Sequence, residues 1–185
     1  MIEETIKDLE KTFERILEGL KKDLTRIRTG RANLALLDGI KIDYYGQPTP
    51  LAHIATLSIP QPSTIAIRPF EKRLIPAIEK AIQASDIGLT PMNDGEVIRL
   101  NIPKLTTERR RELVKTIKKK GEEAKISLRN ARREKKSKLE KAIKGEGLPE
   151  DDVRRAIDKI TKLTDEAVKK VDEIIAAKEK EIMEV

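Results

Sequence analysis

Lysine and arginine are the residues of this 185-residue chain whose number and spacing indicate a binding chemistry. Residues 105–144 hold sixteen Lys and Arg against six Asp and Glu, whereas the rest of the chain is close to neutral. The densest stretch is SLRNARREKK, residues 127–136, in which Glu134 is the only acid. Basic character confined to one segment favours a polyanionic partner, and both RNA and an acidic protein fit that description.

The basic residues gather on one face if this segment is helical. With Leu128 as the origin and about 100° per residue, eight of the sixteen fall within a sector of about 100° beside the packed side of the helix. They are Arg111, Lys115, Lys118, Lys125, Arg129, Arg132, Arg133 and Lys136. The sector is about 37 Å long. Two interpretations stay open: an ordinary solvated helix face, and a surface for phosphate groups, which the planar donor fork of Arg suits.

Catalytic and metal-binding residue types are scarce. The chain has no Cys and a single His, His53, so thiolate ligands and disulfides are excluded. Asp86, Asp94 and Glu96 lie near turn signals, where capping suits them better than acid–base catalysis. No G-x-x-x-x-G-K-[ST] phosphate loop is present. The sequence therefore predicts a protein that is not an enzyme and that uses no cofactor and no metal.

Three long helices are predicted from apolar residues that recur every three or four positions. The first has about 28 residues and ends near Gly30, and the second starts at Thr106 or Thr107, either of which can cap it. The third follows KGEGLPEDD, in which Gly145 and Gly147 suit a helix end and Pro149 a helix start. The short connection makes the last two helices antiparallel, and the first completes a three-helix bundle.

Residues 31–104 have a different character. IKIDYY, IATLSI and TIAIRPF alternate apolar and polar residues as half-buried strands do, and an Asn93–Gly95 turn precedes the strand EVIRLNI. A helix is expected around residues 74–82. The predicted class is α+β: an elongated three-helix bundle of residues 1–30 and 105–185, with a small α/β domain of residues 31–104 inserted after the first helix. Two chain crossings join the parts, an arrangement that permits a hinge.

Alternative functions fit the sequence less well than a polyanion binder does. A coiled-coil chaperone or scaffold shares the helical hairpin but does not need a basic sector. Tyr44 and Tyr45 could stack on bases, yet strand alternation favours one ring in the core and one outside. The chain has no run of 18 apolar residues and no signal-peptide pattern, so we expect a cytoplasmic protein with no membrane segment.

Five stretches, taken in order along the chain, resemble the bacterial ribosome recycling factor family. They are RIRTGRAN (26–33), DYYGQPTPL (43–51), DIGLTPMNDGEVIRLNIPKLTTERR (86–110), RNARRE (129–134) and LTDE (163–166). Thr90 departs from the pattern, since the family more often has Asn there. The resemblance implies an L-shaped, tRNA-like monomer. It also implies that the protein binds the post-termination ribosome and, with elongation factor G and GTP, splits it into subunits and releases mRNA and tRNA.

The resemblance also assigns residue roles. Arg129, Arg132 and Arg133 match the family's cluster that contacts large-subunit rRNA, and Arg28 and Arg31 match its RTGR motif. Together with Lys125, Lys136, Arg111 and Lys118 of the basic sector, these form the predicted rRNA-binding set. The predicted hinge comprises Thr29, Gly30, Arg31, Ile102, Pro103, Lys104 and Leu105. The small domain is expected to meet elongation factor G.

Overall fold

The computed structural model describes residues 1–184, which form two compact units. The first unit combines Met1–Leu24 with Arg111–Glu184, and the second is the intervening segment Thr25–Arg110. Val185, the last residue of the predicted bundle, lies outside the described residues.

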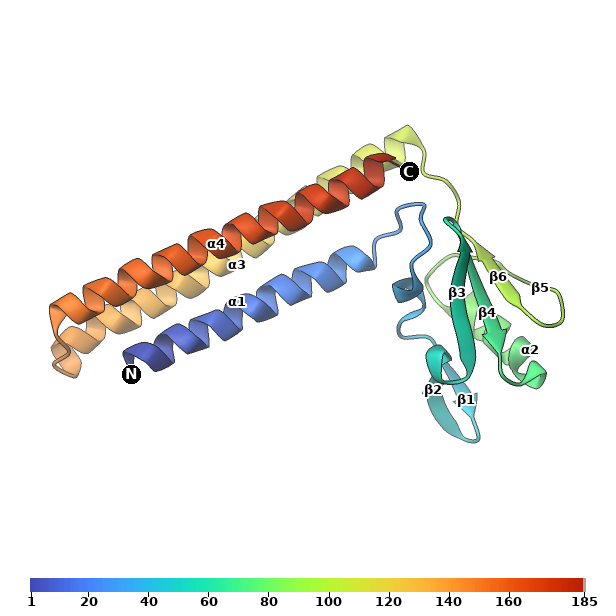
Figure 1. Cartoon of the computed structure of the whole chain (residues 1–185), viewed down its shortest axis with the longest axis horizontal. Helices are drawn as coiled ribbons and strands as arrows, with labels where there is room; N and C mark the ends of the chain where they lie inside the picture. Colours follow the sequence, from blue (N-terminus) through green and yellow to red (C-terminus); the bar gives the residue numbers. More distant parts are fainter. Residues whose placement is uncertain (185) are drawn as a thin grey trace. The chain divides into compact units, whose positions relative to one another are not determined.

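Three long helices build the first unit: α1 (Ile2–Thr25), α3 (Thr107–Gly145) and α4 (Glu150–Glu184) (Figure 1). The apolar spacing read from the sequence is confirmed, because the residues at that spacing are the ones that are buried. Leu9 of α1, Leu128 of α3 and Ile160 of α4 are fully buried. The other buried seam residues of α3 are Leu113, Ile117, Gly121, Ala124, Leu139 and Ala142.

The ends of α3 follow local rules that the sequence displays. The Thr106 hydroxyl accepts a hydrogen bond from the Arg109 N–H at 3.1 Å, so Thr106 caps the helix. At the other end, Gly147 has a φ of 67°, and the Glu146 N–H donates to the Ala142 carbonyl oxygen at 3.0 Å. This left-handed Gly lies just past the helix end at Gly145, and four residues separate that end from the start of α4 at Glu150, which makes α3 and α4 antiparallel.

The first helix is shorter than predicted. It ends at Thr25 after 24 residues, and Ile27, which continues the apolar period, belongs to the second unit. The residues that follow are bonded inside that unit: Arg28 Nη1 donates to the Ile87 carbonyl oxygen at 3.3 Å. A long-range contact therefore overrides the local helical pattern.

Antiparallel strands and one helix form the second unit. The hairpin pairs β1 (Lys41–Tyr44) with β2 (Gln47–Pro50). A four-stranded sheet of order β3-β4-β6-β5 contains β3 (Ala55–Gln61), β4 (Thr64–Pro69), β5 (Pro91–Asn93) and β6 (Ile98–Asn101). Helix α2 (Ile75–Ala84) packs against β1 and β5, and three short 3-10 helices, Leu34–Leu37, Leu51–His53 and Lys72–Leu74, complete the unit.

Two strands were not predicted, namely β2 and β5. Both contain proline, Pro48 and Pro50 in β2 and Pro91 in β5, and proline argues against an interior strand because it cannot donate to the ladder. Both strands pair on one side only, where a missing N–H is tolerated. The predicted strands of β1, β3, β4 and β6 and the helix α2 are confirmed. Their inward residues, Ile65, Ile67, Ile78, Ile82, Ile98 and Leu100 among them, form one apolar core.

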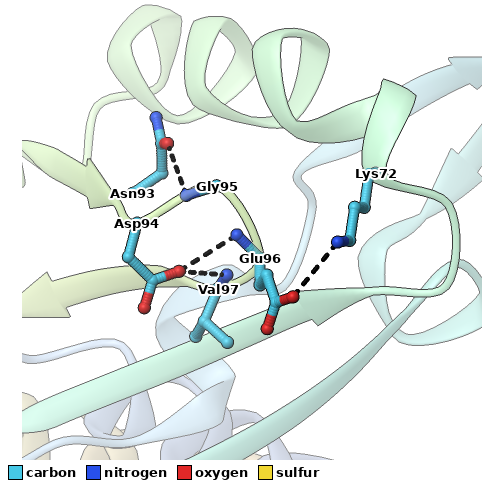
Figure 2. Close-up of polar contacts among 6 residues, drawn as sticks. All are labelled: Lys72, Asn93, Asp94, Gly95, Glu96 and Val97. Atoms are coloured by element: carbon cyan, nitrogen blue, oxygen red, sulfur yellow. Dashed lines mark hydrogen bonds and ion pairs between the residues drawn. The ribbon is translucent and has the colours of Figure 1, made fainter.

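The Asn93–Gly95 turn is confirmed, and its side chains hold it. Figure 2 shows the Asp94 carboxylate accepting from the N–H groups of Glu96 and Val97, at 3.0 and 2.8 Å. Arg99 Nη1 lies 2.7 Å from the second Asp94 oxygen. The Arg99 guanidinium, helped by the two N–H groups, holds the pKa of Asp94 well below its ordinary value. Asp94 is thus a turn-forming acid, as its position in the sequence suggested.

Candidate nucleic-acid interface on helix α3

The basic sector of α3 contains two kinds of side chain, which differ in whether an acid neutralises them. The sector lies beside the buried seam, and the spacing of seam residues sets the direction of every basic side chain on the helix. Most of the eight residues are exposed, whereas Lys125 and Arg132 are half-buried. The ion pairs of the first unit then decide which charges remain available.

Lys118, Lys125 and Lys136 have acidic partners. Lys125 Nζ lies 2.5 Å from Asp172 Oδ1 of α4 and 3.2 Å from Glu122 Oε1 of its own helix, and its side chain is only 16% exposed. The hydrogen bond to Asp172 raises the pKa of Lys125 above its ordinary value, although partial burial opposes the shift. The other two pairs are longer: Lys118–Glu179 at 3.6 Å and Lys136–Glu140 at 3.7 Å. Lys118 and Lys125 therefore link α3 to α4, whereas Lys136 pairs within α3.

The arginine cluster, which consists of Arg129, Arg132 and Arg133, differs from these lysines in its pairing. Within residues 1–184, none of the three forms an ion pair or a side-chain hydrogen bond. Arg129 and Arg133 are exposed and Arg132 is half-buried next to the seam. Three adjacent guanidinium groups with unused donor forks, on a rigid helix, form a site that matches phosphate oxygens in geometry and charge.

Three further arginines, one of the basic sector and two of the RTGR motif, differ in their environments. Arg111 and Arg31 are exposed, and the described residues supply neither with an acidic partner. Arg28 is half-buried and its guanidinium already donates to the Ile87 carbonyl oxygen, so part of its donor capacity is used inside the second unit. The RTGR motif therefore contains one arginine with a structural contact and one in solvent.

The predicted hinge residues differ in burial. Thr29, Gly30 and Ile102 are buried, and the Ile102 N–H donates to the Ser63 carbonyl oxygen at 2.8 Å. In contrast, Arg31, Pro103 and Lys104 are exposed and Leu105 is half-buried. Residues 103–105 carry no regular secondary structure.

The sequence predicted the eight basic residues as one set, without the division between paired and unpaired charges. The partners of Lys118 and Lys125 lie on α4, more than 40 positions away along the chain. Charge periodicity within α4 shows that Asp172 and Glu179 share a helix face, seven residues apart. The sequence therefore showed that the two acids share a face of α4. It did not show how α4 is positioned along α3, which decides the lysines that these acids meet.

The remaining candidates for chemistry have ordinary roles. His53 is exposed in a short 3-10 helix, and the residues that the structure describes contain no group of three or more His, Cys, Asp or Glu placed to hold a metal ion. No helix within residues 1–184 is long and apolar enough to cross a membrane.

The first unit is a helical bundle whose α3 presents three arginines with no acidic partner among the described residues. The second is a small antiparallel unit of the same chain. This architecture defines a class of two-unit protein that acts by binding a partner. The family described as "Ribosome recycling factor" matches residues 20–183. A ribosome-recycling factor of Anaeromyxobacter dehalogenans is 50% identical over 178 residues, which cover 96% of this chain and 95% of the relative. Another, from Symbiobacterium thermophilum, is 47% identical over the full length of both chains.

Solved structures agree with the sequence relatives. A solution structure of the ribosome recycling factor has a TM-score of 0.82 and 40% identity, and the match covers 100% of this chain and 98% of that one. A second structure describes the T. thermophilus ribosome recycling factor and the E. coli elongation factor G bound to the E. coli post-termination complex. It matches with a TM-score of 0.67, 42% identity and 98% coverage of both chains. The chain belongs to the ribosome recycling factor family. Its function is ribosome recycling in translation, and it is not an enzyme.

Proposed function

We propose that the chain binds the post-termination ribosome in the cytoplasm as a monomer and, with elongation factor G and GTP, separates the subunits so that mRNA and tRNA are released. The family membership supports the recycling step, and the related complex with elongation factor G and the ribosome supports these partners. GTP hydrolysis is assigned to elongation factor G, because the present sequence has no phosphate loop.

The binding surface is argued from one observation: among residues 1–184, Arg129, Arg132 and Arg133 have no acidic partner, whereas three neighbouring lysines do. Large-subunit rRNA is the proposed ligand of this arginine cluster. A phosphate contact releases counterions only if the cation is not already neutralised within the protein. Arg111 and Arg31 extend the surface, and the paired lysines and Arg28 contribute less.

The hinge is proposed at the chain crossings between the two units. On the second crossing the structure favours Pro103–Leu105 as the bending segment, because Ile102 is anchored in the core of the second unit. On the first crossing Thr29 and Gly30 are buried, so we propose that bending there requires their neighbours Arg28 and Arg31 to move.

The test compares Arg133→Ala with Lys118→Ala in binding to isolated large subunits, from low to moderate salt. Both side chains are exposed and on the same sector, but within the described residues an acidic partner is present for Lys118 and not for Arg133. We expect Arg133→Ala to weaken binding and to reduce the slope of log affinity against log salt by about 1, and Lys118→Ala to change the slope less. Arg132→Glu should weaken binding further, with a nearly unchanged melting temperature. Equal slopes in all variants would contradict the arginine cluster, and absence of subunit splitting with elongation factor G and GTP would contradict the function.

A further inference from the structure

Basic residues of α3 and acids of α4 form an ion-pair ladder between the two helices. Its two pairs are Lys118–Glu179 at 3.6 Å and Lys125–Asp172 at 2.5 Å. From the first pair to the second, the residue number rises by seven on α3 and falls by seven on α4, a step of about 10.5 Å along each helix. One further step leads to position 132 on α3 and position 165 on α4, which Arg132 and Asp165 occupy. A cation and an acid therefore stand at the third position of the ladder.

Apolar packing between the helices gives the same alignment independently. Gly121 lies between the two ladder lysines in α3, and Ile175 lies between the two ladder acids in α4. A Cβ atom at Gly121 would lie 2.8 Å from Ile175 Cγ1, so these two positions are directly opposed. Figure 1 shows α3 and α4 running side by side. Because seven residues fall only about 20° short of two full turns, each step of the ladder stays on the same flank of its helix.

The third position differs from the first two because its charges are not joined. Within residues 1–184, neither Arg132 nor Asp165 forms an ion pair or a side-chain hydrogen bond. Lys162 and Lys169 lie three and four positions from Asp165 on α4, and neither pairs with it in the described part of the chain. Arg132 is half-buried and Asp165 is exposed. The Asp165 carboxylate therefore faces the arginine cluster without a cation that neutralises it.

A lone carboxylate at this position acts on any phosphate that approaches Arg132. It repels the phosphate, and it also offers oxygen atoms that compete for the donor fork of the arginine. Two unit charges about 6 Å apart in water change a binding constant by about 3-fold. This cost depends on where the phosphates of the ligand lie, because it falls as a phosphate moves away from the carboxylate. Asp165 therefore distinguishes ligands by the placement of their phosphates.

We propose that Asp165 is a specificity-determining residue of the basic surface, which weakens binding of flexible single-stranded RNA more than binding of the folded large subunit. A single strand distributes its phosphates over the whole arginine cluster, including the side next to Asp165. Folded rRNA holds its phosphates in fixed places, so it contacts the arginines without setting one against the carboxylate. Discrimination of this kind uses an unfavourable charge against the wrong ligand. The inference rests on the proposed function, because it takes large-subunit rRNA as the ligand of the cluster.

The test uses Asp165→Asn in the full-length protein, which removes the charge and keeps the shape of the side chain. Binding is measured to isolated large subunits and to a labelled oligouridine, each from low to moderate salt. Glu173→Gln is the matched control: Glu173 is also an exposed acid of α4 with no ion pair among the described residues, but it lies about 80° further round the helix. The melting temperature of each variant shows that the bundle is folded.

We expect Asp165→Asn to strengthen oligouridine binding by about 3-fold at low salt, and to change binding to large subunits less, so that the ratio of the two affinities falls. In an Arg132→Gln background the gain for oligouridine should largely disappear, because the carboxylate acts at that arginine.

Three results would overturn the inference: no gain for oligouridine, equal gains for oligouridine and large subunits, or the same gain in Glu173→Gln. A full gain in the Arg132→Gln background would show that Asp165 does not act at Arg132, and would overturn it as well. Failure of the wild type to split ribosomes with elongation factor G and GTP would refute the proposed function, while the oligouridine measurements still decide whether Asp165 opposes phosphate at Arg132.

Discussion

Gly121 lies where α3 packs tightly against Ile175 of α4, and replacing it with Ala gives a sharp test of the helix packing. A Cβ atom added at Gly121 would lie 2.8 Å from Ile175 Cγ1 and 3.1 Å from Ile175 Cδ1, distances at which one of the helices or the Ile175 side chain must move. Removing a glycine from a helix interior gains about 1 kcal/mol. Overpacking of this kind costs about 1–3 kcal/mol, so we expect Gly121→Ala to lower the free energy of unfolding by about 1 kcal/mol.

The measurement is urea denaturation followed by far-UV circular dichroism, with Gly19→Ala as the control. Gly19 is inside α1, and an added Cβ there would have no atom within 4 Å, so the same substitution should stabilise the protein by about 1 kcal/mol. In an Ile175→Ala background, which removes both clashing atoms, Gly121→Ala should also become stabilising, with a coupling of about 2 kcal/mol. If Gly121→Ala alone stabilises as much as Gly19→Ala, the close approach of the two helices is wrong.

Two local features give further predictions. Thr106→Ala removes the cap of α3 and should lower the free energy of unfolding by about 1 kcal/mol in the same denaturation assay. The control is Thr107→Ala, one residue inside the helix, which should cost much less. Equal costs for the two variants would refute the capping role of Thr106. The pKa of Asp94 is depressed below its ordinary 3.8 in the folded protein, so the ionised carboxylate contributes stability above that pH and loses it as the pH falls through the folded pKa. Asp94→Asn should therefore be less stable than the wild type at neutral pH, and the difference in free energy of unfolding should narrow as the pH is lowered below about 3.8. A difference that does not depend on pH would contradict the role of the Asp94–Arg99 pair.

Patterns that depend on a few neighbouring residues were readable from the sequence. The 3.6-residue period placed Leu128 and Ile117 in the seam of α3, and the Asn-Asp-Gly triplet predicted its turn. The basic segment and its arginine cluster were equally visible. These features are local because backbone geometry alone relates side chains three or four positions apart on a helix, or two apart on a strand.

Tertiary structure decided the properties that depend on segments far apart in the chain. It ended α1 at Thr25 because the next residues bond within the second unit, and it admitted proline-containing strands at sheet edges. It also separated Lys125 from Arg133, since the rotation and axial offset of α4 bring Asp172 to Lys125, whereas no acid of the described part of the chain pairs with Arg133. The sequence alone determined where the basic residues lie on their helix, whereas packing between helices determined which of them remain available to a partner, because an ion pair requires both charges within about 4 Å.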